Sequence, residues 1–445
     1  MSKSSFSQYA SAIVILFVCC FPVAIDPLDN FGVGTTSNSH FLIPAFGQRQ
    51  LSLPQLNDEA LRVELVIEEL LFPTSMVFVD NDTLLVTQKN NGNVISIING
   101  KVNNHSATSV EVNNEGFKGH LGIAAMEKPS SSSHTKFVFL YFTESLGEEQ
   151  TRNRVYRYEW NRENQVLVKG TMILDLPAEP ESVHNGGKLE ADRNDNLYAV
   201  IGDLGRDGQL QNVRDGPAAD DTSVIIRITQ NGSSAADNPF VESSNERMQK
   251  YFAYGIRNSF GLAIDPIRGL LWDTENGPDS YDEINIVHPG FNSGWNRIMG
   301  PTSPSSTEQA DLEEELMIFD GSKYADPVFS WKDPAGLTDL EFFNSTAFGP
   351  EYAYNLFVGD INNGNLYYFE LNENRTGIKL DDSDLDDLTV QVADDEQELS
   401  EIVFGNGFEG GITDIETGPD GFLYILTFNG NIYRILPVAD ESRQD

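Results

Sequence analysis

One strand pattern recurs six times along this chain of 445 residues. In each copy, a short segment with Gly, Thr or Ser leads into an apolar strand, a turn, a strongly apolar strand, a polar turn and a further strand. The clearest copies begin at Pro73 (PTSMVFVDNDTLLVTQKNNGNVISI) and at Gly411 (GITDIETGPDGFLYILTFNGNIYRI). The equivalent points are Ser75, Gly122, Lys188, Gly261, Asp339 and Asp414, at spacings of 47, 66, 73, 78 and 75 residues. The shortest spacing is close to the ~40–50 residues of a four-stranded propeller blade, and the others leave room for long loops.

Six such units with turn signals and little helical periodicity predict an all-β fold, a six-bladed β-propeller. The segment from Leu61 to Leu70 (LRVELVIEEL) has strand character and precedes the first copy. We expect it to pair beside Gly430–Leu436 in the last blade, which would close the ring and cover an open sheet edge. A pair of β-sandwiches is the alternative, and six like units make it the weaker one. The propeller is expected over residues 61–437, after a low-complexity linker (26–60) and before a polar tail (438–445).

The N-terminal residues predict export. Lys3 precedes an apolar run from Ala10 to Ile25, 16 residues long, whereas a membrane-spanning helix needs ~20. A positive charge followed by a mid-length apolar run is typical of a signal peptide. Because no small-x-small cleavage site stands out, residues 1–25 are interpreted as a signal peptide or as an uncleaved membrane anchor through residues 10–25. Either interpretation predicts an extracellular or cell-surface protein.

The cysteines and the sequons are relevant to the predicted extracellular or cell-surface location. Cys19 and Cys20 are the two cysteines, and both lie in the apolar run. The domain that follows therefore has no disulfide, no thiolate metal site and no Cys nucleophile. Five Asn-x-Ser/Thr sequons would be glycosylation acceptors in a host that modifies them: Asn81, Asn104, Asn231, Asn344 and Asn374.

The negative charge of the chain argues against polyanionic partners. The chain has 29 Lys and Arg against 68 Asp and Glu, a formal net charge of −39, so broad electrostatic binding to nucleic acid or anionic lipid is excluded. Because 40% of the residues are apolar, general disorder is a poor interpretation. The acidic runs at 311–315, 381–387 and 394–398 are expected to be solvated loops rather than specific Ca²⁺ sites.

Two segments depart from what strand building requires. In the first, His184 precedes Asn185-Gly186-Gly187. Glycines let the backbone approach a ligand closely, and histidine titrates near neutral pH, as a general base requires. The alternative is a histidine that is simply hydrogen-bonded within its loop.

The second segment combines a cation with many oxygen ligands. Arg257 and Asn258 lie next to glycines and offer donors for carboxylate or sugar oxygens. Further on, Glu275 to Glu283 (ENGPDSYDE) supplies carboxylates, amides and turn carbonyls within nine residues. Hard cations such as Ca²⁺ require such oxygens, although an acidic loop between strands is the alternative.

Three quoted segments, HNGG, GIRNSFGLAIDP and TENGPDSYDEINIVHPGFNSGW, resemble the signature segments of the soluble glucose/sorbosone dehydrogenase family. The similarity runs in the same order from about Leu61 to Leu436. The resemblance implies a six-bladed propeller that uses pyrroloquinoline quinone and Ca²⁺ to oxidise an aldose or a related polyol, with an external electron acceptor.

The resemblance also implies roles for individual residues. His184 matches the base that takes the sugar hydroxyl proton, Arg257 the arginine beside the quinone carbonyls, and Asn258 its neighbour in the pocket. Gly277 and Pro278 match the backbone carbonyl ligands of the Ca²⁺ at the cofactor. Asp282 and Glu283 match carboxylates of a further, structural Ca²⁺ site.

Some positions depart from the family pattern. Phe117 stands where the family has an active-site glutamine, and Val183 where it has an acid before the histidine. Asn362 and Asn363 replace a Lys-Arg pair that helps to hold the cofactor carboxylates. Loss of these cations from a chain of charge −39 should weaken binding of a tricarboxylate, unless Lys118 or His120 compensates.

These observations leave two functions from different classes. The first is an exported quinone-dependent dehydrogenase, favoured by His184 and Arg257. The second is a non-catalytic, Ca²⁺-binding surface propeller that binds a carbohydrate or a protein partner, favoured by Phe117, Val183 and the asparagine pair. The sequence does not determine the sugar or the oligomeric state.

Overall fold

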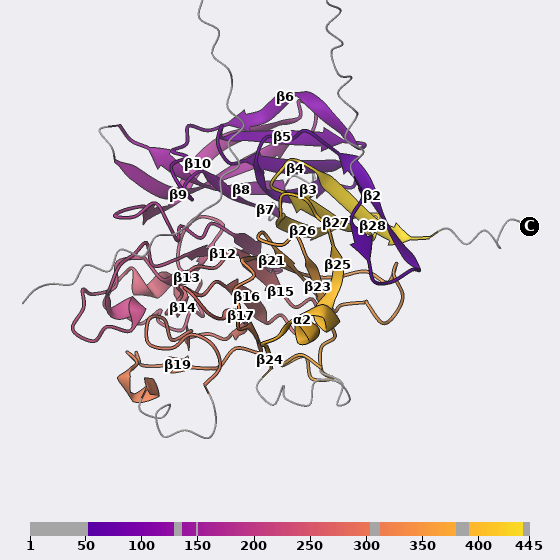
Figure 1. Ribbon diagram of the computed structural model, residues 1–445. Helices are drawn as coiled ribbons and strands as arrows, with labels where there is room; N and C mark the ends of the chain where they lie inside the picture. The colour runs from indigo at the N-terminus through magenta and orange to yellow at the C-terminus, as the bar shows by residue number, and fades with distance from the viewer. Residues whose placement is uncertain (1–51, 129–135, 148–149, 303–311, 380–390, 439–445) are drawn as a thin grey trace, which may run out of the picture. The chain divides into compact units, whose positions relative to one another are not determined.

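Six sheets account for nearly all the regular structure of the computed structural model (Figure 1). The structure describes residues 52–128, 136–147, 150–302, 312–379 and 391–438. These residues belong to a compact unit that begins at Ser52. The expected signal or anchor segment, the acidic run at 381–387 and most of the linker and tail lie outside the described residues.

The strands of each sheet follow, in order across the sheet. The first sheet contains β3 (Pro73–Asp80), β4 (Thr83–Gln88), β5 (Asn93–Ile98) and β6 (Lys101–Ser109). The second contains β7 (His120–Glu127), β8 (Lys136–Ser145), β9 (Thr151–Asn161) and β10 (Val166–Pro177). The third contains β11 (Leu189–Ala191), β12 (Asn196–Ile201), β13 (Val224–Thr229), β14 (Tyr251–Tyr254), β18 (Phe291–Asn292) and β19 (Lys323–Tyr324).

The fourth sheet contains β15 (Gly261–Ile264), β16 (Leu271–Glu275), β17 (Asp282–Val287), β20 (Phe329–Trp331) and β24 (Val392–Ala393). The fifth contains β21 (Leu337–Phe342), β22 (Leu356–Asp360), β23 (Leu366–Phe369), β25 (Val403–Asn406) and β1 (Gln55–Leu56). The sixth contains β26 (Ile412–Thr417), β27 (Leu423–Thr427), β28 (Ile432–Pro437) and β2 (Leu61–Ile67). Short helices η1 (Gln209–Gln211), η2 (Met248–Lys250) and α2 (Glu396–Ile402) lie in the connections.

The first strand of each sheet packs against the first strand of the next. Strand β3 contacts β7, which contacts β11; β11 contacts β15, β15 contacts β21, β21 contacts β26, and β26 contacts β3. The six equivalent points of the repeat lie on these strands or directly before them, so the repeat marks the innermost position of each sheet. The all-β propeller arrangement expected from the sequence is confirmed.

Burial on both faces explains why the second strands of the sheets do not alternate between apolar and polar residues. All six residues of β4 (TLLVTQ) and of β12 (NLYAVI) are buried, because neighbouring sheets pack on both of their faces. Clusters of buried apolar residues extend from one sheet to the next; one cluster contains both Ala124 of β7 and Leu197 of β12. The core therefore lies between the sheets.

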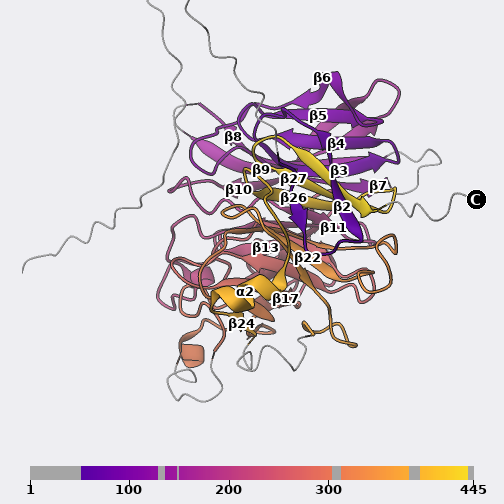
Figure 2. The same ribbon diagram turned by 45° about the vertical axis from the view of Figure 1, so that its right-hand side comes forward.

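A strand near the start of the described chain, β2, shares a sheet with the last strand, β28. Strand β2 pairs antiparallel with β28, with Leu61 opposite Pro437 and Val63 opposite Ile435. The two strands lie side by side in Figure 1, and Figure 2 shows the yellow C-terminal strand beside the indigo β2. Strand β1 pairs with β25, so paired structure is already present within the stretch 26–60 that we assigned to the linker.

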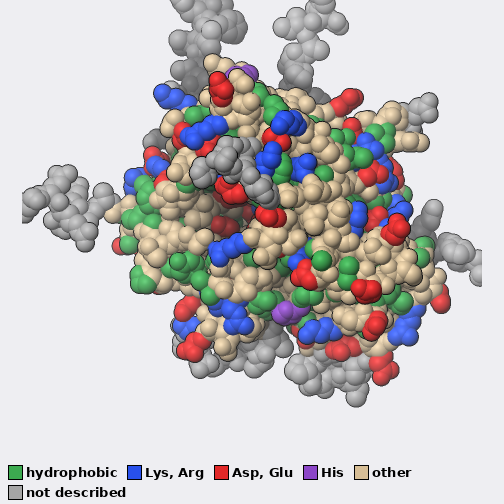
Figure 3. Space-filling model, turned by 180° about the vertical axis from the view of Figure 1, so that it is seen from behind, with side chains coloured by type: hydrophobic (Ala, Val, Ile, Leu, Met, Phe, Trp, Pro, Cys, Tyr) green, Lys and Arg blue, Asp and Glu red, His purple; other side chains and the backbone are tan. Residues whose placement is uncertain are grey.

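Charged side chains of both signs are interspersed on the face shown in Figure 3. No helix among the described residues is long and apolar enough to cross a membrane. In the acidic run 394–398, Asp395 caps α2 by accepting hydrogen bonds from the backbone N–H groups of Gln397 and Glu398.

Candidate active site

His184 is paired with a carboxylate that the sequence did not reveal. Its Nδ1 lies 2.6 Å from Oδ1 of Asp203, in the loop that follows β12. The second carboxylate oxygen of Asp203 accepts a hydrogen bond of 2.7 Å from Nε1 of Trp295. The side chain of His184 is 20% exposed and that of Asp203 is 4% exposed. A buried carboxylate thus holds a histidine that solvent can reach.

Arg257 belongs to the same site. Its carbonyl accepts a hydrogen bond of 3.0 Å from the backbone N–H of Asp203. A Cβ on Gly202 would lie 2.4 Å from the carbonyl oxygen of Arg257 and 2.6 Å from that of His184. Only glycine therefore allows the His184 and Arg257 segments to approach one another here.

The guanidinium of Arg257 lies over an aromatic ring and retains a free donor. Its central carbon is 5.3 Å from the centroid of the Trp295 ring, a cation–π distance. Nη1 donates to the carbonyl of Asn276 at 2.8 Å, whereas the buried Nε has no partner among the described residues. Burial lowers the pKa of Arg257, and the charges of Asp203 and Glu275 oppose that effect.

Backbone hydrogen bonds join the Arg257 segment to the loop that contains Gly277 and Pro278. The carbonyl of Asn258 accepts from the N–H of Asn276 at 2.8 Å. The Asn258 side chain is buried, and its Oδ1 has no partner among the described residues. Gly277 is buried and Pro278 is exposed. The structure therefore brings Arg257, Asn258 and this loop together.

Asp282 holds this loop against the next sheet. Its Oδ1 accepts from the N–H of Gly277 at 2.9 Å, and its Oδ2 accepts from the N–H of Gly336 at 2.7 Å. Burial raises the pKa of Asp282, while these backbone donors counteract it. The observed contacts of Asp282 account for a positioning role, and its role as a metal ligand stays a prediction.

Glu283 lies in a group of buried carboxylates on β16 and β17. Glu275 is directly opposite Glu283 in the pairing of these strands, and Asp273, Glu275 and Glu283 are 0%, 0% and 2% exposed. Both carboxylate oxygens of Asp273 lack a partner among the described residues. Burial raises the pKa of Glu275 to about 7, and burial together with Glu275 raises the pKa of Glu283. Such a group is costly without a cation or protons.

The sheet ends that bear these loops define what we call the His184 face. It consists of the loops before the first strands β7, β11, β15 and β21 and the loops after the second strands β12, β16 and β22. In an antiparallel sheet, the start of the first strand and the end of the second lie at the same end. Hydrogen bonds connect these loops from sheet to sheet, as between the N–H of Phe117 and the carbonyl of Ser182 at 2.9 Å.

The positions that depart from the family pattern also lie on the His184 face. Phe117 is 53% exposed, and its hydrogen bond to Ser182 places it beside the His184 loop. Asn362 and Asn363 are exposed, and the backbone N–H of Asn363 donates to Asp360. This loop presents amides rather than cations.

Neither compensating cation suggested by the sequence is available. Nζ of Lys118 is bound to Glu179 at 3.0 Å, with the lysine side chain 3% exposed. His120 is fully buried, and burial lowers its pKa to about 3, so it is neutral. Neither residue therefore offers a free cation to an anionic cofactor, because Lys118 is already neutralised by a carboxylate and His120 is desolvated.

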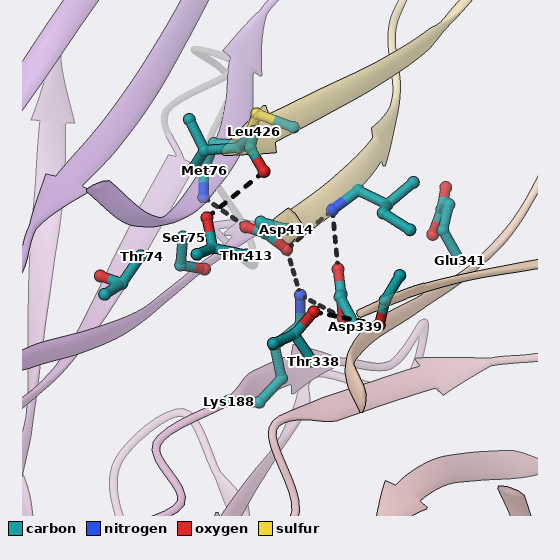
Figure 4. A network of polar contacts seen from close by, with 12 residues as sticks. Thr74, Ser75, Met76, Lys188, Thr338, Asp339, Glu341, Thr413, Asp414 and Leu426 are labelled. Carbon is teal, nitrogen blue, oxygen red and sulfur yellow. Dashed lines mark hydrogen bonds and ion pairs between the residues drawn. The ribbon is translucent and has the colours of Figure 1, made fainter. Parts of the chain in front are cut away.

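A second polar network lies on the innermost strands. Nζ of Lys188 is 2.8 Å from Oδ1 of Asp339 and 2.5 Å from Oδ1 of Asp414. Figure 4 shows Lys188 reaching toward both carboxylates, with Glu341 nearby. Burial opposes the charge of Lys188, but the two carboxylates outweigh it and raise its pKa. This network joins three sheets and is separate from the His184 site.

Asp203 and Trp295 are the site residues that sequence reasoning missed. The signal for Asp203 was its place between Gly202 and Gly205, directly after a buried strand. Trp295 is the last residue of TENGPDSYDEINIVHPGFNSGW, and the family resemblance implied no role for it. Both are long-range partners, 19 and 111 residues from His184 in the sequence.

Comparison with known proteins identifies related sequences. The sequence model of the family described as Glucose / Sorbosone dehydrogenase matches residues 70–434. Aldose sugar dehydrogenase YliI of Escherichia coli K12 is 29% identical over 273 residues, a match that covers 60% of this chain and 64% of that protein, just under two thirds of its length.

Solved structures agree in fold. The PQQ-bound aldose sugar dehydrogenase of Streptomyces coelicolor has a TM-score of 0.62 and 21% identity, with 86% of this chain and 99% of that chain covered. The apo form of the Escherichia coli aldose sugar dehydrogenase has a TM-score of 0.64 and 24% identity, with coverage of 85% and 100%. Identities this low establish the shared fold alone.

Proposed function

Because this chain belongs to the glucose/sorbosone dehydrogenase family, we propose that it is an exported, quinone-dependent dehydrogenase that oxidises an aldose sugar or a related polyol. The observation that carries this proposal is the pair formed by His184 and Asp203, 2.6 Å apart, beside Arg257. A propeller needs no histidine–carboxylate pair at an exposed loop for its stability.

His184 is proposed to act as the general base. Asp203 accepts from Nδ1–H, which leaves Nε2 as the unprotonated nitrogen of the imidazole. Among the described residues no hydrogen bond is made to Nε2, so this nitrogen is available to take the proton of a substrate hydroxyl. Asp203 also stabilises the imidazolium that results, and Trp295 fixes the orientation of Asp203.

The residues around Arg257 fit an anionic cofactor. Among the described residues, Nε of Arg257 and Oδ1 of Asn258 have no partner, and a polar ligand would satisfy both atoms. Pyrroloquinoline quinone, when bound, would supply the acceptor for the hydride that leaves the alcohol carbon. Arg257 and Asn258 would hold it, and the backbone of Gly277 and Pro278 would bind the Ca²⁺ beside it. An external electron acceptor completes the turnover.

The buried carboxylates fit a structural Ca²⁺ site. Among the described residues the carboxylate oxygens of Asp273 have no partner, and, after burial, the charge of Glu275 further raises the pKa of both Asp273 and Glu283. A hard divalent cation would offset this repulsion with oxygen ligands of the type it prefers. We therefore assign Glu283 to this site together with Asp273, and we retain Asp282 beside it as the predicted ligand from the sequence.

The six sheets are proposed to be six blades of a closed ring. The contacts from β3 through β26 and back to β3 support this arrangement. The pairing of β2 with β28 would then be the closure, which joins the ends of the chain and removes an open edge. We also propose that residues 1–25 direct export and that the protein is extracellular or at the cell surface.

The second candidate is a non-catalytic, Ca²⁺-binding propeller that binds a carbohydrate or a protein partner. Asn362 and Asn363 favour it, because the exposed loop between β22 and β23 offers no cation to a tricarboxylate, and Phe117 favours it as well. The two candidates share the Ca²⁺ sites and differ in cofactor binding and in the need for His184.

Reconstitution distinguishes the two candidates. The purified chain is loaded with pyrroloquinoline quinone and Ca²⁺, and dye reduction is measured with several aldoses, while cofactor binding is followed by absorbance. For a dehydrogenase we expect a cofactor spectrum and turnover that His184→Ala abolishes without loss of cofactor binding. No cofactor spectrum, and turnover no higher in the wild type than in His184→Ala, would overturn the proposal in favour of the binding protein.

A further inference from the structure

All five sequons of this chain present their asparagine to solvent. Asn81, Asn104, Asn231, Asn344 and Asn374 are each exposed. Among the described residues, none of these five side chains donates a hydrogen bond through Nδ2, the nitrogen that a glycosyl transfer would modify. Within the part of the chain that the structure describes, Arg157 donates a hydrogen bond to Asn231, and Oδ1 of Asn231 accepts it.

The sequons also share one end of the sheets, which we call the opposite face. Asn81 lies in the turn between β3 and β4, and Asn344 lies between β21 and β22. Both turns connect a first strand to a second strand. They are therefore at the sheet end remote from the His184 face.

The remaining three sequons also lie at this end of the sheets. Asn231 comes directly after β13, whose other end begins beside Ser223 and Gly202 of the His184 face. Asn374 follows β23, which ends at Phe369 opposite Leu356, the start of β22. Asn104 lies in the edge strand β6, near its turn with β5, where Ile98 pairs with Lys101.

The His184 face contains no sequon. This face is rich in asparagine, yet none of those in the loops around His184 is followed by a hydroxyl residue at the second position. Several have their amide in use: Asn212 donates to Asn292, Asn276 to the carbonyl of Leu337, and Asn296 to Asp207, at 3.0 Å in each case. The sequons thus all lie on the opposite face, and none lies on the His184 face.

We propose that the opposite face carries N-linked glycans on Asn81, Asn104, Asn231, Asn344 and Asn374, and that the His184 face stays free of them. The donor is an oligosaccharide linked through phosphate to a lipid. The C–O bond between the sugar and the phosphate breaks, a C–N bond to asparagine Nδ2 forms, the amide loses one proton, and the lipid phosphate leaves. No group is oxidised or reduced.

Glycans on the opposite face would not block the His184 site. A glycan is bulky and hydrated, so it is tolerated where a side chain points into solvent and has no contacts to lose. On the opposite face it would leave the loops of His184 and Arg257 accessible to a small molecule. The inference requires export, but it does not depend on the proposed dehydrogenase activity.

The test is glycopeptide mapping by mass spectrometry of the protein purified from its native source. We expect modified peptides at the five asparagines and unmodified peptides throughout the His184 face. Unmodified sequon peptides, or glycans on the His184 face, would overturn the proposal.

Matched variants assign each glycan to its sequon. Thr346 and Thr376 are exposed, so their substitution spares the core. Thr346→Ala and Thr376→Ala should each remove one glycan, at Asn344 and Asn374, whereas Thr346→Ser and Thr376→Ser should retain it. If the alanine variants keep these glycans, the modification is not sequon-directed and the proposal fails.

Discussion

Nδ1 of His184 lies 2.6 Å from Oδ1 of Asp203, a residue 19 positions further along the chain. The carboxylate comes from the end of a buried strand, and the histidine comes from a loop with two glycines. This pair separates two tasks: Asp203 orients the ring, and His184 faces the solvent from which a substrate would enter.

Replacement of Asp203 by Asn should lower kcat for dye reduction by about 10²–10⁴-fold, because the imidazole would lose its orienting acceptor and the partner for its positive charge. Trp295→Phe removes only one donor to Asp203 and should cost about tenfold. Both variants should retain the cofactor spectrum. If Asp203→Asn and the wild type have the same kcat and the same pH profile, the pair has no catalytic role.

Addition of Ca²⁺ to chelated protein should raise its thermal stability. At about 100 times the dissociation constant, the free energy of unfolding should increase by about 2.7 kcal/mol. Differential scanning calorimetry of Asp273→Asn and Glu283→Gln should show that the calcium-dependent part of this increase shrinks. Asp395→Asn, which changes an exposed acidic cluster at α2, is the control and should behave as the wild type does.

The substitutions Asn362→Lys and Asn363→Arg should tighten binding of pyrroloquinoline quinone by about tenfold for each added charge, a gain of about 1.4 kcal/mol. Both side chains are exposed, so their replacement spares the core. Absorbance titration of the cofactor measures the effect. Asn194→Lys adds the same charge on the opposite face, and an equal gain in that variant would show that only the net charge matters.

Stability should fall as the pH rises from about 4.5 to about 8. Burial raises the pKa of Glu190 to about 8 and that of Glu341 to about 7, with the charge of Lys188 opposing in both cases. Above the ordinary pKa of a glutamate, the unfolded chain releases these protons while the native state keeps them. The two buried glutamates therefore cost the native state nothing at pH 4.5, and their destabilising effect grows as the pH rises to about 8. Glu190→Gln should raise the melting temperature at pH 8.5 and change it little at pH 4.5. Glu373→Gln, at an exposed position, should have no effect at either pH, and a melting temperature that is flat over this range would contradict the assignment.

Removal of the positive charge at Lys188 should be strongly destabilising, since Lys188→Met leaves Asp339 and Asp414 buried without their cation. The expected loss is about 3–5 kcal/mol of unfolding free energy, measured by urea denaturation. The double variant Lys188→Met/Asp339→Asn should recover part of this loss. If the two substitutions are additive, the network is not coupled as its geometry indicates.

The propeller arrangement could be predicted from the sequence because its determinants are local. Alternating apolar strands and Gly- or Asn-rich turns recur six times, and β2 beside β28 follows from strand character at both ends of the chain. The residues that match the family pattern, such as His184 and Arg257, could likewise be identified from short sequence segments.

The partnerships in the site could not be predicted, because they join residues that are remote in sequence. Asp203 meets Trp295 across 92 residues of sequence, and Lys118 meets Glu179 across 61. Lys188 meets Asp339 and Asp414 only because three sheets pack together. The sequence alone also did not show that all five sequons lie on one face. The sequence determined which strands form, because the alternation of apolar and polar residues is local; only the tertiary structure decided which buried charges meet, because those contacts depend on how strands pair and how their connecting loops and sheets pack.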